Sequence, residues 1–392
     1  MPRRMNDAEL VELVMARFHP LINDPVAGVM PYSKLLENRF PGLDEPTLSR
    51  GIKEAFHRRL VELRPSEGVK PSERNAGLER DLRRTFGAGD ADRLKTVIVL
   101  HFAPNVAIDA DDIARAVGWS FGEWLMGSRV VGSKSVIGVG TGQTIYRVSE
   151  YVHERGAVPE DAIPAENVTL ASLTGRLNAR VRTKRNALAD SDINAVRMGM
   201  GIAGQVNYRL IGLPALRPEE NSERRSAPPS QLQLDYALVG FGPFDQIRRD
   251  LVALSRAQDP LRAQLKELHE IEEKLSGIRG GDRLPPFTPI GDVGGQLLAI
   301  DPPAGLKLTK QQQAHLESLP AKLTALSSRI LTVDEQTLSR TRLWIVGGGV
   351  TKGHILRSIL RSHVAGKGFV VDTLVTDSAC AEAALEAESP SP

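Results

Sequence analysis

The sequence predicts a mainly parallel α/β domain that follows a small helical module. Three observations support this prediction. Short apolar, β-branched runs alternate with helical segments over most of the chain, the first 66 residues carry apolar side chains at helical spacing, and a Gly/Thr-rich turn joins one apolar run to a helix. With 392 residues, 41% of them hydrophobic and 25% charged, the chain is long enough for two or three globular domains.

The composition excludes several classes of protein. Cys380 is the single cysteine, so no disulfide can form within the chain, which suits a reducing, cytoplasmic location. No apolar run approaches the roughly 20 residues that span a bilayer, and the first residues lack the apolar core of a secretory signal, so we expect no membrane partner. The net charge of +2 is nearly balanced, and nucleic-acid binding would therefore need a local basic patch.

Residues 1–66 fit the pattern of a winged helix-turn-helix DNA-binding domain. The expected elements are a helix from Asn6 or Asp7 that ends before Pro20, a helix over 33–40, a third helix from Asp44 or Glu45 with Pro46 in its first turn, and a short strand over 60–63. In such domains the start of the third helix enters the major groove, where arginine pairs with guanine and hydroxyls reach bases or phosphates. The candidate DNA-binding residues are Thr47, Ser49, Arg50, Lys53 and Arg58.

The same residues fit a second interpretation, a solvated helix face whose basic side chains do not bind DNA. Asp44 and Glu45 stand at the start of the third helix, and carboxylates placed there repel phosphates. The basic patch continues through His57 to Arg64, which favours the DNA-binding interpretation.

A linker and a long α/β domain follow. Residues 67–74 are polar and contain Pro and Gly, as linkers do. The domain is expected over 75–384, with its ligand at the carboxyl ends of the strands. The expected strands lie near 96–102, 135–140, 167–173, 208–213, 235–241, 343–347 and 369–375, with a long helix over 109–130. Residues 385–392 are expected to form a disordered tail.

Two helical segments interrupt this alternation. Residues 244–278 carry apolar side chains mostly three or four positions apart, and Asp259-Pro260 divides them into two helices. This helical insert is either an oligomerisation element or an amphipathic hairpin that covers the sheet. The second segment, 308–330, is helical and shows no visible chemistry.

The turn after the apolar run at 136–139 is the strongest candidate binding site. It contains Gly140, Thr141, Gly142, Gln143 and Thr144 and leads into a helix. Glycine lets backbone N–H groups approach an anion closely, and a helix start supplies further donors, so phosphate is a natural ligand. A simple tight turn between strand and helix is the alternative.

Three further residues are candidates for the same ligand. Lys352 follows a second strand and glycine turn, where it can neutralise phosphate, although a solvated lysine fits equally well. Asp292 stands between glycines and suits sugar hydroxyls, but it also suits a turn or a helix cap. Arg176 begins a basic run that can reach an anion or remain a solvated loop. The histidines show no metal-binding spacing, and we find no Ser-His-Asp signature.

Taken together, these motifs resemble the SorC family of bacterial transcriptional regulators, relatives of the DeoR type. The similar segments are 44–63, Leu78–Leu82 with Phe86–Gly87, Ile137–Ile145, Asp235–Gly242, Ile290–Asp292, Gly347–Lys352 and Val375–Asp377. They occur in the family's order and span about four fifths of the chain.

The resemblance implies a DNA-binding regulator without enzymatic activity or cofactor. It implies an N-terminal winged helix-turn-helix and a C-terminal Rossmann-like α/β effector domain similar to sugar-phosphate isomerases. A sugar or sugar phosphate would control how a homodimer or homotetramer holds its operator. By position, Gly142, Gln143, Thr144 and Lys352 would bind phosphate, and Asp292 would meet sugar hydroxyls.

An enzyme, a sugar-phosphate isomerase or deaminase of the related fold, is the alternative. The loop at 140–144 looks like that of ribose-phosphate isomerase. The acidic "D-G-A-D-E" motif of that family is replaced here by Gly240–Phe244, which removes the expected general base.

Overall fold

The computed structural model of the chain describes residues 5–23, 32–41, 43–57, 72–87, 94–102, 108–158, 161–175, 190–212, 216, 233–255, 259–276, 278, 285–303, 306–364 and 368–386. The chain divides into two compact units, Met1–Pro71 and Ser72–Pro392. Each unit is described by itself.

The N-terminal unit contains three helices packed on one small core. They are α1 (Asp7–Asn23), α2 (Tyr32–Asn38) and α3 (Glu45–His57). Asn6 caps α1, because its side chain accepts from the Glu9 N–H while Glu9 accepts from the Asn6 N–H. The core consists of Met5, Leu10, Leu13, Val14, Ala16, Leu35, Phe40, Leu48, Ile52 and Ala55. The three predicted helices are confirmed, and the predicted strand at 60–63 lies outside the described residues.

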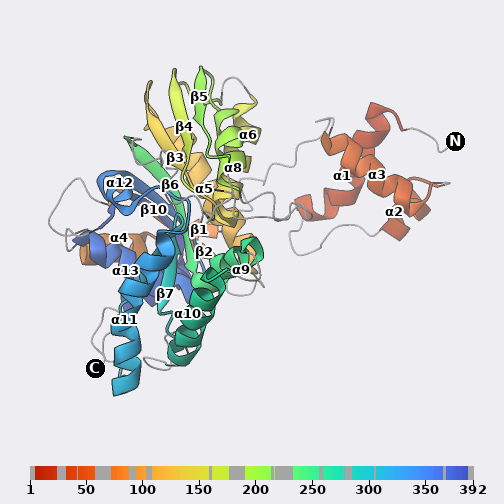
Figure 1. Cartoon of the computed structure of the whole chain (residues 1–392). Helices are drawn as coiled ribbons and strands as arrows, with labels where there is room; N and C mark the ends of the chain where they lie inside the picture. The colour runs from red at the N-terminus through yellow and green to blue at the C-terminus, as the bar shows by residue number, and fades with distance from the viewer. Residues whose placement is uncertain are drawn as a thin grey trace. The chain divides into compact units, whose positions relative to one another are not determined.

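The C-terminal unit is built on a mostly parallel sheet, as predicted (Figure 1). Strands β2, β10, β9, β6, β3, β4 and β5 are parallel neighbours in that order. Their bounds are β2 (Thr96–Phe102), β3 (Val136–Val139), β4 (Val168–Ser172), β5 (Val206–Arg209), β6 (Tyr236–Pro243), β9 (Arg342–Val346) and β10 (Val370–Asp377).

Helices cover both faces of this sheet (Figure 1). Helices α5 (Ala110–Ser128), α6 (Gln143–Gly156) and α8 (Ser191–Gly199) pack on one face. Helices α4 (Ala76–Phe86), α13 (Gly353–Val364) and α14 (Ser378–Glu386) pack on the other. Alternate strand residues divide between the two cores, since Val97 and Val99 belong to one and Ile98 and Leu100 to the other. No helix in the described ranges is long and apolar enough to cross a membrane.

A hairpin that the sequence did not indicate extends the central strand. It consists of β7 (Ile290–Val293) and β8 (Gln296–Ala299), and β7 pairs antiparallel with the end of β6. In this register Asp292 stands opposite Gly242. The hairpin therefore carries Asp292 to the carboxyl end of β6.

Helix α1 runs through Pro20, before which it was expected to end, and reaches Asn23. Three further predicted boundaries, all in the C-terminal unit, differ in the structure. Ser72–Arg74, assigned to the linker, form strand β1 and pair antiparallel with β2, where Arg74 meets Glu79 at 2.8 Å. The strand expected over 208–213 is β5 (Val206–Arg209). Leu385 and Glu386, assigned to the tail, belong to α14. In each case tertiary pairing or packing determines the boundary, and local composition does not reveal it.

The helical insert forms two helices, α9 (Phe244–Leu254) and α10 (Leu261–Ser276), divided as predicted. Asp259 accepts from the Leu261 N–H at 2.9 Å and so caps the second helix. Together with α11 (Lys310–Ser327), both helices contribute their apolar faces to the core of one sheet face. The remaining helix, α12 (Glu335–Arg340), precedes β9. This packing favours a hairpin that covers the sheet over a separate oligomerisation arm.

This packing makes a stability prediction. Leu265→Ala removes a fully buried side chain and leaves a cavity, which is expected to lower the free energy of unfolding by about 3 kcal/mol. Lys266→Ala, at a neighbouring exposed position of α10, should change it by less than about 0.5 kcal/mol. Denaturant unfolding measures both. A Leu265→Ala protein as stable as the wild type, but altered in oligomeric state, would contradict this packing.

Candidate functional site

The order of the strands places a topological switch point, where α/β folds form a ligand-binding crevice, at the carboxyl ends of β3 and β6. From β3 the chain moves outward through β4 to β5, whereas from β6 it moves the opposite way through β9 to β10. Loops that leave adjacent strands in opposite directions leave a gap between them, and α/β proteins bind ligands there. The candidate effector-binding residues that the structure describes lie near this edge: Gly140–Thr144 follow β3 and begin α6, Asp292 lies on β7, and Lys352 follows β9.

The loop after β3 leaves backbone donors available. Gly142 has φ of 113° and makes no side-chain cap, and a Cβ built on it would meet nothing within 4 Å. Helix α6 begins at the next residue, so its first N–H groups lack a capping partner. Thr144 is buried, while Gln143 is exposed. This geometry is the one that an anion or a hydroxyl oxygen can use.

Helix α8 fixes the position of this loop, a role that sequence reasoning missed. The Gly140 N–H donates to the Leu238 carbonyl at 2.9 Å, and the Asn194 amide donates to the Gly140 carbonyl at 3.3 Å. The Ser191 hydroxyl donates to the Val139 carbonyl at 2.5 Å. Asp190, which accepts from the Asp192 N–H, caps α8. The signal in the sequence was this cap followed by short polar residues.

Asp111 joins α5 to the start of α6. Its carboxylate accepts from the Gln143 amide at 2.5 Å and from the Arg147 guanidinium at 3.0 Å. Arg147 also pairs with Glu150 at 2.8 Å. The Arg147 hydrogen bond, first among several causes, lowers the pKa of Asp111 and keeps it charged. The side chain of Gln143 is therefore held by α5, and its backbone N–H is what remains for a ligand.

The second half of the site surrounds Lys352. The loop after β9 contains Gly349, with φ of 103°, whose N–H donates to Asp377 at 2.6 Å. Lys352 ends the short 3-10 helix η3 (Val350–Lys352), and its ammonium lies 5.8 Å from the ring centroid of Phe241. Asp292 accepts from the Gly295 N–H at 2.9 Å. The structure thus brings a lysine and two carboxylates, from three separate segments, to one edge.

Burial perturbs the ionisation of this group. Burial raises the pKa of Asp292 to about 7, although the Gly295 N–H and the Lys352 ammonium favour its charged form. Burial also raises the pKa of Asp377, against the hydrogen bond from Gly349. The pKa of Lys352 is lowered by burial, against the opposing fields of Cys380, Asp377 and Asp292. Such perturbed groups in a crevice are typical of binding or catalytic sites.

Strand β6 lies between the two halves. A Cβ built on Gly240 would lie 3.5 Å from the Thr141 carbonyl and 3.8 Å from the Val346 carbonyl. The loop at 140–144 and the group around Lys352 thus flank the same glycine. Backbone N–H donors on one side and carboxylate acceptors on the other can bind a polyhydroxylated molecule, and Lys352 can add a contact to an anionic group.

In the N-terminal unit, the candidate DNA-binding residues occupy the start of α3. Asp44 caps this helix by accepting from the Thr47 N–H at 2.8 Å. Arg50 is exposed and bends back, donating to the Thr47 hydroxyl at 3.2 Å and to the Pro46 carbonyl at 3.3 Å. Ser49 is partly exposed on the same helix. The side chain of Lys53, and the whole of Arg58 and Arg176, lie outside the described residues.

Comparisons with known proteins connect this fold to bacterial regulators. No family model matches the chain, and no curated protein sequence matches it. Among solved structures, the full-length sorbitol operon regulator SorC from Klebsiella pneumoniae is similar over 98% of this chain and 100% of its own, with 16% identity and a TM-score of 0.50.

Two further structures are similar to most of the chain. A transcriptional regulator from Streptococcus pneumoniae matches 79% of this chain and 96% of its own, with 13% identity and a TM-score of 0.52. The putative sugar-binding domain of a transcriptional repressor from Vibrio fischeri matches 79% and 98%, with 17% identity and a TM-score of 0.51. At these identities the likeness concerns the fold, and for the fold it confirms the resemblance that the sequence indicated.

The raised pKa of Asp292 predicts a pH-dependent stability. Its folded-state pKa of about 7 exceeds the ordinary 3.8, so between these values the unfolded state releases the proton that the folded state keeps. Asp292 therefore lowers stability progressively as pH rises from about 3.8 to about 7. Asp292→Asn stays neutral and still accepts from Gly295. The melting temperature of the variant minus that of the wild type should therefore be larger at pH 8 than at pH 5. An identical difference at both pH values would contradict the burial of this carboxylate.

Proposed function

We propose that the chain is a transcriptional regulator of the SorC type whose hold on operator DNA is controlled by a sugar or sugar phosphate. The observation that carries the proposal is the crevice at the carboxyl ends of β3 and β6, where the uncapped start of α6 and Lys352 flank Gly240. Fold neighbours that are regulators, one of them a sugar-binding domain, support this assignment.

The proposed effector site has two parts, the loop after β3 with the start of α6, and the group around Lys352. Backbone N–H groups of Gly142, Gln143 and Thr144 would bind the anionic or hydroxyl oxygens of the ligand. Lys352 would neutralise a phosphate, and Asp292 would accept from sugar hydroxyls. Thr141 and Gly140 shape the loop. Arg176, selected from the sequence as a further anion-binding residue, lies outside the described residues and stays a prediction.

The proposed DNA-binding surface is the start of α3. Thr47, Ser49, Arg50 and Lys53 would face the major groove in a winged helix-turn-helix, and Arg58, outside the described residues, stays a candidate from the sequence. A homodimer or homotetramer would present this surface in pairs, so a roughly palindromic operator is expected. The protein would exist in one arrangement that binds the operator and one that does not. The effector would shift the balance between them by binding one more tightly than the other.

A sugar-phosphate isomerase or deaminase remains the second candidate, and one observation weighs against it. At the position of that family's acidic motif, Phe241 is buried and its ring faces the Lys352 ammonium. The acidic positions of the motif are occupied here by Gly240, Pro243 and Phe244, none of which can act as a general base. Detectable turnover of ribose 5-phosphate would favour the enzyme.

Arg50→Ala tests the DNA-binding surface. The side chain lies outside the core of the N-terminal unit, so the variant should fold normally, but it loses a base or phosphate contact and should weaken operator retention at least tenfold in a gel shift. Arg84→Ala, which removes an exposed arginine from α4, is the matched control. If both variants retained the operator equally well, Arg50 at the start of α3 would not contact DNA.

Lys352→Ala tests the effector site. The variant should lose most of the thermal shift that a cognate phosphosugar produces, because it loses a charge-assisted contact, while operator binding without effector is retained. Lys310→Ala, at an exposed position of α11, should keep the full shift. If Lys352→Ala kept the full thermal shift, Lys352 would not contact the effector.

A further inference from the structure

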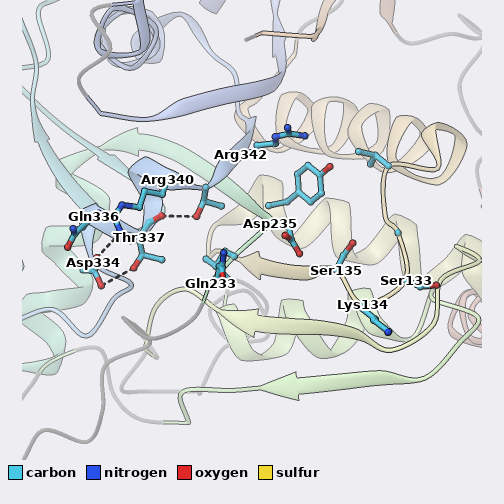
Figure 2. Close-up of a pocket in the computed structure, with 15 residues that line it drawn as sticks. Ser133, Lys134, Ser135, Gln233, Asp235, Asp334, Gln336, Thr337, Arg340 and Arg342 are labelled. Atoms are coloured by element: carbon cyan, nitrogen blue, oxygen red, sulfur yellow. Dashed lines mark hydrogen bonds between the residues drawn. The ribbon is translucent and has the colours of Figure 1, made fainter. Parts of the chain in front are cut away.

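A second pocket lies at the opposite edge of the sheet, where the central strands begin. Its volume is about 1030 Å³, and it is lined by residues at or before the starts of β3, β6 and β9 (Figure 2). The lining comes from segments 130–135, 233–236 and 334–342. The shortest of these strands, β3, is four residues long, so about 13 Å separates this pocket from the crevice at the carboxyl ends.

The pocket carries an excess of available positive charge. Lys134, Arg340 and Arg342 line it, are exposed, and form no ion pair with any residue in the described ranges. Two carboxylates line it as well, but backbone N–H groups already bind them. Asp235 accepts from Val136 at 2.8 Å, and Asp334 accepts from Thr337 at 2.7 Å. The lining thus holds three cationic and two anionic side chains, and the cations, which form no ion pair within the described residues, can bind anionic oxygens.

The positions of these side chains fit a ligand with charge at both ends. Figure 2 shows Arg340 and Lys134 toward opposite ends of the pocket, with Gln233, Asp235 and Ser135 between them. Each end thus offers a cation, while the part between them offers an amide, a hydroxyl and a carboxylate, together with Arg342 (Figure 2). This pattern matches a small molecule with anionic groups at its ends and hydroxyls between them.

The walls of the pocket are held in place before any ligand binds. Lys134 adopts φ of 69°, a left-handed conformation that is unfavourable for a lysine, in a turn closed by the Ser135 N–H and the Gly132 carbonyl at 3.2 Å. Tyr236 stacks on the buried ring of Trp344, with centroids 4.5 Å apart and an interplanar angle of 21°. A fixed backbone at Lys134 and a fixed aromatic wall reduce the entropy lost on binding.

We propose that this pocket is a second binding site, specific for small hydroxylated polyanions. The shared chemistry is that of two or more anionic groups on a hydroxyl-bearing carbon skeleton, either as phosphate esters or as carboxylates. The site is independent of the crevice proposed for the effector, because the two share no residue and occupy opposite edges of the sheet.

Isothermal titration with the full-length Lys352→Ala chain tests the proposal without contribution from the other site. The probes are glucose 1,6-bisphosphate for phosphate esters, citrate for carboxylates, and glucose as the neutral control. We expect at least one polyanion to bind and glucose not to bind. Adding Arg340→Ala and Arg342→Ala should weaken binding of that polyanion at least tenfold, whereas Arg249→Ala, an exposed arginine of α9, should not.

A second variant separates binding from folding. Glycine suits the φ of 69° at position 134, so Lys134→Gly should melt no lower than the wild type while its affinity for the polyanion falls several-fold and becomes less dependent on salt. Failure of both polyanions to bind Lys352→Ala would overturn the proposal. So would affinities that are unchanged in the Arg340→Ala, Arg342→Ala double variant and in Lys134→Gly.

Discussion

The parallel pairing of β6 with β3 on one side and β9 on the other is the constraint on which the site depends. Near their carboxyl ends, Val139 of β3 pairs with Leu238 of β6, and Val346 of β9 pairs with Gly240, so the loops after β3 and β9 leave from the same edge. The ladder continues past the end of β3, where the Gly140 N–H meets the Leu238 carbonyl. The loops after β3 and β9, which are far apart in the chain, thereby come together. Strand pairing alone does this, and no contact between the side chains of the two loops is needed.

Electrostatic compensation allows a partly buried lysine at this edge of the sheet. An isolated buried ammonium is costly, and a carboxylate on either side offsets part of that cost. Asp377 is held by the Gly349 N–H and Asp292 by the Gly295 N–H, so both carboxylates are fixed by backbone donors. The result combines one cation with several acceptors, a set that suits a hydroxylated ligand better than a bare anion.

The sequence predicted the buried parallel strands well because they are covered on both faces and read as continuous apolar runs. Residues 96–102 and 342–346 are examples. The hairpin at 290–299 was not predicted, since its short strands exist through pairing with β6. The same limit applied to the site: Lys352 and Asp292 were selected from the sequence, but Asp377 and Asp111 were not, because their roles depend on partners distant in the chain.

Local chemistry in the sequence by itself determined the elements and the candidate residues. Glycine at position 142 permits a positive φ, Asp259 and Pro260 divide two helices, and Asp44 caps the third helix. Tertiary structure alone decided which of these elements are neighbours. It placed α8 under the loop at 140–142, and it gathered Lys134, Arg340 and Arg342 at the opposite edge. Strand order is set by packing between distant segments, and no local pattern encodes it.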